Sequence, residues 1–72
     1  MANSFVLMKT EEKDAMGKLN KIPEVVEVNS LYGKEYNLMA EVETGNRTLK
    51  EIIEKEIKKI PGMSVMKILN GC

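Results

Sequence analysis

Residues 21–28 read KIPEVVEV and residues 59–66 read KIPGMSVM, so Lys-Ile-Pro occurs twice, each time directly before a strand-like run. The residue before a proline disfavours helical backbone, so each Ile-Pro should end a helix. A shift of 38 positions superimposes the segments before the two prolines as well, placing Thr10 on Thr48 and Leu19 on Ile57. The sequence therefore predicts two copies of a helix-then-strand unit.

The rest of the chain completes these units. Thr10 can cap the first helix, and Thr48 with Glu51 three residues later forms a capping box for the second. The predicted elements are a strand (4–9), a helix (10–22), two strands (25–32 and 36–43), a helix (48–60) and a strand (63–69). This order predicts an α+β, ferredoxin-like βαββαβ fold, in which a four-stranded antiparallel sheet carries two helices on one face.

Length and charge restrict the classes of protein. Seventy-two residues make a single domain, residues 1–72, and so small a scaffold often gains stability by oligomerising. Eleven basic residues balance eleven acidic ones, so no net field favours nucleic acid or a membrane surface. No apolar run suits a signal peptide or approaches the ~20 residues of a membrane span, and we expect a cytoplasmic protein. The single cysteine, Cys72, is expected to be a free thiol near the chain end.

One face of the predicted sheet has no helix to cover it. The first strand is apolar on both sides, and further large apolar residues occur in the third and last strands. An exposed apolar patch usually marks an interface, so we predict a symmetric homodimer formed through the sheets. The predicted interface residues are Val6, Met8, Met39, Met66 and Ile68. The alternative is that the methionines fill an irregular core or are scattered over the surface.

The residue types exclude several chemistries. Without histidine there is no Ser-His or Cys-His nucleophile pair, and no phosphate-binding glycine motif is present. RNA-binding sheets use exposed aromatic residues, whereas the one phenylalanine, Phe5, is expected in the core. We predict no enzyme activity, metal or cofactor.

The turn at residues 31–37, LYGKEYN, combines a glycine, two tyrosines, a carboxylate, an amine and an amide. It is either a hairpin turn with packing tyrosines or part of a ligand pocket in which Asn37 both donates and accepts hydrogen bonds.

Three phrases together, IPEVVEV (22–28), YGKEYNL (32–38) and IPGMS (60–64), resemble the effector domain of Lrp/AsnC transcription regulators, also called the RAM domain. The resemblance implies dimers joined through their sheets, rings such as octamers, and amino-acid effectors bound between dimers. It places ligand contacts at Gly33, Tyr36 and Asn37, with Tyr32, Glu35 and Ser64 as weaker candidates. Asn37 stands where the family usually has aspartate, and Glu24 where it has glycine.

Only three residues precede the first predicted strand, so the resemblance implies a stand-alone effector domain without the family's helix-turn-helix. We therefore predict a module that senses a small molecule, most simply an amino acid, and oligomerises. It would modulate transcription through full-length partner regulators and would not bind DNA directly. The alternatives are a purely structural assembly module without an effector, or a small dimeric enzyme of ferredoxin-like fold.

Overall fold

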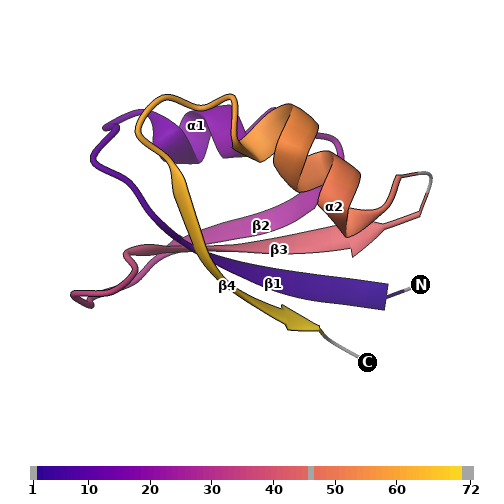
Figure 1. Cartoon of the computed structure of the whole chain (residues 1–72), viewed down its shortest axis with the longest axis horizontal. Coiled ribbons are helices and arrows are strands. Elements are labelled where there is room, and N and C mark those ends of the chain that lie inside the picture. The colour runs from indigo at the N-terminus through magenta and orange to yellow at the C-terminus, as the bar shows by residue number, and fades with distance from the viewer. Residues whose placement is uncertain (1, 46, 71–72) are drawn as a thin grey trace.

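The computed structural model describes residues 2–45 and 47–70 and contains four strands and two helical segments (Figure 1). The second helical segment consists of a short α-helix, α2, followed directly by a π-helical turn, η1. In chain order the elements are β1 (Ala2–Lys9), α1 (Ala15–Asn20), β2 (Val25–Ser30), β3 (Leu38–Thr44), α2 (Leu49–Ile52), η1 (Ile53–Ile57) and β4 (Ser64–Asn70).

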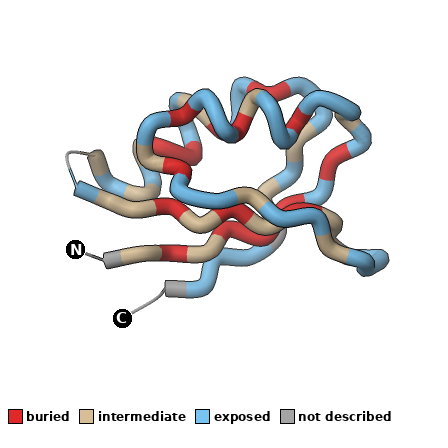
Figure 2. The backbone as a smooth tube through the Cα atoms, turned by 180° about the vertical axis from the view of Figure 1, so that it is seen from behind, coloured by how far each residue is buried: buried red, intermediate tan, exposed pale blue. Residues whose placement is uncertain are grey.

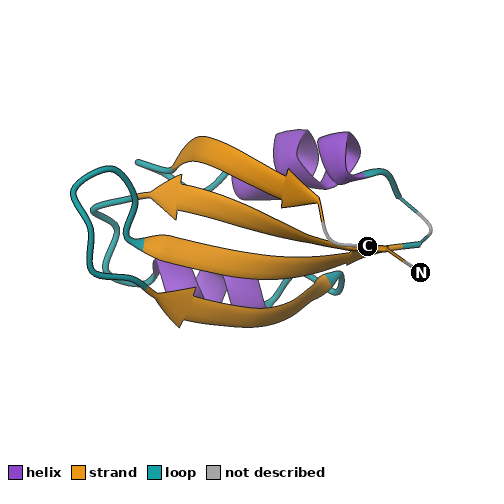
Figure 3. Ribbon diagram, turned by 90° about the horizontal axis from the view of Figure 1, so that it is seen from below, coloured by secondary structure: helices purple, strands orange, loops and turns teal. Residues whose placement is uncertain are grey.

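All neighbouring strands are antiparallel, in the order β2-β3-β1-β4. Both helical segments cover the same face of the sheet, and the opposite face, seen from below in Figure 3, carries no helix. The predicted ferredoxin-like βαββαβ fold is thus confirmed. None of the helices in residues 2–45 and 47–70 has the length and apolar character needed to cross a membrane.

The hydrophobic core lies between the helical layer and the sheet, and along most of β3 buried positions alternate with half-buried ones (Figure 2). From α1 and the turn after it come Ala15, Leu19 and Ile22, which share one helical face because they lie three or four residues apart. The Ile-Pro repeat therefore anchors the end of each helix in the core: Ile22 and Ile60 are only 5% and 7% exposed.

The second helix begins as predicted. The Glu51 backbone N–H donates to the Thr48 hydroxyl oxygen at 3.2 Å, which caps the first turn. At Ile53 the helix widens, and the Lys58 N–H donates to the Ile53 carbonyl at 2.8 Å, five residues back. This spacing stacks Ile52 and Ile57 on one face, and neither side chain is exposed to solvent.

The first helix is shorter than predicted. Regular helix starts at Ala15 because the Thr10 hydroxyl accepts from the Glu12 N–H at 3.0 Å and closes a local turn instead of capping a continuous helix.

The predicted dimer interface places Val6 and Met8 on the wrong face of the sheet. Val6 and Met8 are fully buried in the core beneath the helices, so Phe5 and Leu7 lie on the other face of the sheet, where Phe5 is half-buried and Leu7 is only 5% exposed. Phe5 is consequently not in the core. The first strand is apolar on both sides, and its alternation alone could not distinguish the two faces.

The last strand contains an irregularity that the sequence did not reveal. Leu7 lies opposite Lys67, but Met8 lies opposite Val65, so a bulge in β4 includes Met66. Ile68, opposite Val6, therefore lies on the helix side, whereas Leu69, opposite Phe5, lies on the open face. Of the four predicted interface residues whose side chains the structure describes, Met39 alone is on the open face, where it is paired with Leu7. The side chain of Met66 and all of Cys72 lie outside the described residues.

A second bulge shifts β2. Val25 pairs with Val42 and Val28 with Ala40, so both valines face the core, and Val26 between them is 55% exposed. Strict alternation along the predicted strand would place Val26 and Val28 on one face, but the extra residue reverses the alternation at this point.

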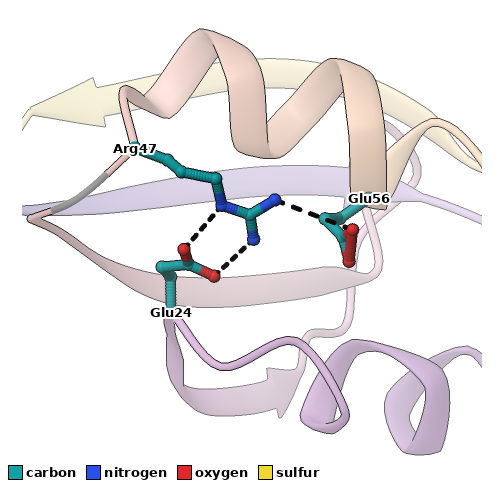
Figure 4. Close-up of polar contacts among 3 residues, drawn as sticks. All are labelled: Glu24, Arg47 and Glu56. Carbon is teal, nitrogen blue, oxygen red and sulfur yellow. Dashed lines mark hydrogen bonds and ion pairs between the residues drawn. The ribbon is translucent and has the colours of Figure 1, made fainter.

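An ion cluster links the start of β2 to the second helix (Figure 4). Arg47 donates two hydrogen bonds to the Glu24 carboxylate, at 2.7 and 2.6 Å, and one guanidinium nitrogen lies 3.7 Å from Glu56. The Arg47 hydrogen bond lowers the pKa of Glu24. Glu24, where the family resemblance placed a glycine, thus joins the loop after β3 to the segment before β2.

We expect Arg47→Gln to change the acid sensitivity of the protein. The pKa of Glu24 is lowered from its ordinary value of 4.5 in the folded state, so the unfolded state binds more protons. The stabilisation is therefore present above pH 4.5 and is lost as the pH falls through the folded pKa. Urea unfolding from pH 7 to pH 3 should show a stability difference between wild type and variant that shrinks on acidification. A difference independent of pH would contradict this.

Candidate functional site

Hydrogen bonds of Asn37 hold the base of the β2–β3 turn, which comprises residues 31–37. The Asn37 side chain accepts from the Thr10 N–H at 3.1 Å and donates to the Thr10 carbonyl at 2.8 Å. The Asn37 main chain donates to the Met8 carbonyl at 2.9 Å and accepts from the Leu31 N–H at 2.8 Å. Asn37 thus joins the turn to the end of β1. Its side-chain amide makes both a donor and an acceptor hydrogen bond to the Thr10 main chain, as a paired strand residue would.

The tip of the turn projects away from this base. Tyr32 is fully exposed, and Gly33 and Glu35 are exposed as well. A side chain at Gly33 would bring a Cβ to 3.0 Å from the Tyr36 carbonyl oxygen, so glycine permits the close approach of these two residues. The turn therefore has a base held by hydrogen bonds and a tip whose side chains are exposed.

One hollow, of about 440 Å³, lies beside the tip of this turn. Its lining residues are Lys9, Lys34, Glu35, Tyr36 and Lys67. The Lys9 ammonium donates to the Lys34 carbonyl at 2.7 Å, which ties the end of β1 to the turn. We call this space the lysine hollow.

A second, smaller hollow of about 260 Å³ lies on the other side of the turn's base, between the turn and the start of α1. Asn37 lines this hollow together with Thr10, Met16 and Leu31. The structure therefore divides the predicted ligand contacts: Tyr36 and Glu35 line the lysine hollow, and Asn37 lines the other.

The remaining predicted contacts lie nearby. Ser64 is exposed at the start of β4, and pairs with Lys9. The ligand roles of Gly33, Tyr36, Asn37, Tyr32, Glu35 and Ser64 stay predictions.

The sequence predicts an amine in the turn, Lys34, but does not group it with Lys9 and Lys67. The three lysines are far apart in the chain, and a bulge determines where Lys67 faces, so no local pattern groups them. With one carboxylate among three ammonium groups, the hollow offers donors for a carboxylate and one acceptor for an ammonium group. Within residues 2–45 and 47–70, no three acidic or cysteine side chains are grouped to hold a metal.

Comparison with known proteins identifies the family. No family model matches the chain, nor does any curated protein sequence. The solved structure of FFRP-DM1, a protein of the Lrp/AsnC type, is similar over the whole of both chains, with 36% identity and a TM-score of 0.81. The chain belongs to the Lrp/AsnC family.

Two further solved structures have a similar fold. The hypothetical protein PHS023 from Pyrococcus horikoshii is 35% identical over all of this chain and 90% of its own, with a TM-score of 0.79. E. coli AsnC has the same fold, with a TM-score of 0.79 at 22% identity, and the match covers 96% of this chain and 49% of AsnC. The family resemblance inferred from the three sequence phrases is confirmed.

Proposed function

We propose that this Lrp/AsnC-family protein is a self-assembling module that binds an amino-acid effector at the lysine hollow. The carrying observation is the combination of three lysines, Glu35 and Tyr36 around one hollow beside an exposed, firmly based turn. A zwitterionic ligand needs donors for its carboxylate and an acceptor for its ammonium group, and the lysines and Glu35 supply both.

Assembly is supported by the open face of the sheet. Four apolar side chains are on this face: Phe5, Leu7, Met39 and Leu69. Glutamates lie on the β2–β3 side, whereas Lys67 lies on β4. A two-fold axis parallel to the strands would place β2 of one protomer over β4 of its partner, so acidic and basic sides would face each other. We propose a homodimer through this corrected surface, and rings of such dimers in which a neighbouring protomer closes the exposed turn.

The regulatory role follows from this assembly. We propose that the chain modulates transcription by entering such assemblies with partner regulators of the Lrp/AsnC type. Its balanced charge gives little support to direct contact with nucleic acid.

Thermal unfolding in the presence of each of the twenty amino acids tests the effector. An amino acid present at about a hundred times its Kd stabilises the folded state by about 2.7 kcal/mol. In so small a domain this raises Tm by roughly 10 °C or more. We expect a selective shift for one side-chain class.

Glu35→Gln should reduce this shift because it removes the acceptor for the ligand's ammonium group. The matched control is Glu11→Gln, which changes an exposed glutamate outside the lysine hollow and should leave the shift intact. No shift with any amino acid would reject the sensing role and favour the second candidate, a structural assembly module. The engagement of both polar groups of the Asn37 side chain with Thr10 favours that candidate.

A further inference from the structure

A second concave surface lies on the helix side of the sheet, away from the β2–β3 turn. This groove has a volume of about 550 Å³ and runs between the second helix and the edge strand β4. Its floor consists of four aliphatic side chains: Leu49, Ile53, Val65 and Ile68. Ile68 is 42% exposed, so part of this floor is open to solvent.

Two backbone irregularities form the groove. The bulge in β4 turns Val65 and Ile68 toward the same side, although they are three residues apart in a strand. Opposite them the helix widens into η1, where the Lys58 N–H reaches back to the Ile53 carbonyl. π-Helical turns are often found at functional sites.

Charged side chains form the rim. Lys50, Glu54 and Lys58 follow one another at four-residue spacing along the groove. In the part of the chain that the structure describes, neither lysine forms an ion pair. The rim therefore carries one net positive charge, with two ammonium groups available beside an apolar floor.

The size of the groove indicates the kind of occupant. Seven residues line it, whereas a stable protein interface uses about 20–30 residues from each partner. Its volume lies in the range of small-molecule sites, about 300–1,000 Å³. We propose that the groove binds a small aliphatic carboxylate, whose chain lies on the Leu49, Ile53, Val65 and Ile68 floor and whose carboxylate meets Lys50 or Lys58. This site is separate from the lysine hollow and does not depend on the proposed effector.

Isothermal titration of the full chain with octanoate tests the site. An open groove and a ligand of this size predict a Kd of about 0.1–1 mM. Hexanoate should bind up to about fifteenfold more weakly, because two fewer methylene groups leave water. Octylammonium, which has the same chain and the opposite charge, should bind more weakly than octanoate because the rim is positive.

Matched variants locate the binding. Lys50→Gln with Lys58→Gln should weaken octanoate binding about fivefold, since each exposed charge pair contributes modestly. The control pair, Lys55→Gln with Lys59→Gln, removes two exposed lysines of the same segment that do not line the groove, and should leave octanoate binding unchanged. Ile68→Ser should weaken binding about fivefold or more. Leu69→Ser, its equally exposed neighbour on the other face, should not.

Several results would overturn the proposal. One is the absence of saturable octanoate heat with the wild-type protein, as when a second copy of the chain covers the groove. A second is equal binding of octylammonium, which would remove the carboxylate from the proposal. A third is an equal loss of octanoate affinity in the two double-lysine variants, which would mean that the effect comes from general surface charge and not from the groove. Loss of octanoate binding on Glu35→Gln would assign the ligand to the lysine hollow instead.

Discussion

Met39→Lys is expected to convert the proposed dimer into a monomer. Met39 lies on the open face beside Leu7, at the centre of the sheet, where a partner sheet would bury it. Burying an unpaired ammonium group in that position weakens the free energy of dimer formation by several kcal/mol. A loss of about 3 kcal/mol already raises the dimer dissociation constant more than a hundredfold. Sedimentation equilibrium across a dilution series measures this directly, and circular dichroism reports whether the monomer is folded.

Ile68→Lys provides the matched control for this change. It places the same charge in the same sheet, but on the helix side opposite Val6, at a position that is 42% exposed. The dimer should survive it. If Ile68→Lys dissociates the protein and Met39→Lys does not, the interface lies elsewhere and the corrected face is wrong. Should Met39→Lys unfold the chain, Leu69→Lys tests the same face from an exposed edge position.

The contrast between Ile68 and Leu69 shows where sequence-based prediction succeeds and where it stops. The Ile-Pro repeat, the Thr48 cap and the isoleucine spacing are local signals, and they predict the order of elements and therefore the topology. The bulges near Met66 and Val26 depend on the register between neighbouring strands. The alternation of side chains within one strand carries no information about this register. One extra residue in a strand moves every later side chain to the other face, so Ile68 was assigned to the wrong face of a correctly predicted fold.

The candidate site shows the same limit in a different form. The turn and its unusual composition are visible in the sequence, and the turn is where the family resemblance points. The lysine hollow is not visible, because Lys9, Lys34 and Lys67 meet only after β1, the turn and β4 are in place. Chemistry that comes from three distant segments can be predicted only once the register between strands is known.

Asn37→Asp, which would restore the residue that the family usually carries, is expected to destabilise this chain by about 1–3 kcal/mol. The aspartate would still accept from the Thr10 N–H, but it could not donate to the Thr10 carbonyl, which lies 2.8 Å from the present amide nitrogen. Two oxygen atoms would then face each other at the base of the turn. For a chain of this length, with about 4–11 kcal/mol of total stability, the loss would be a large fraction.

Urea unfolding at neutral pH measures this loss, and Asn20→Asp is the control. Asn20 is an exposed asparagine at the end of α1, so the same chemical change there should alter stability by no more than about 0.5 kcal/mol. Equal stability of Asn37→Asp and wild type would mean that the Thr10 contacts contribute little and that Asn37 is free to contact a ligand. A selective loss would mean that the amide is held by the fold, so that effector specificity must come from Glu35, Tyr36 and the lysines.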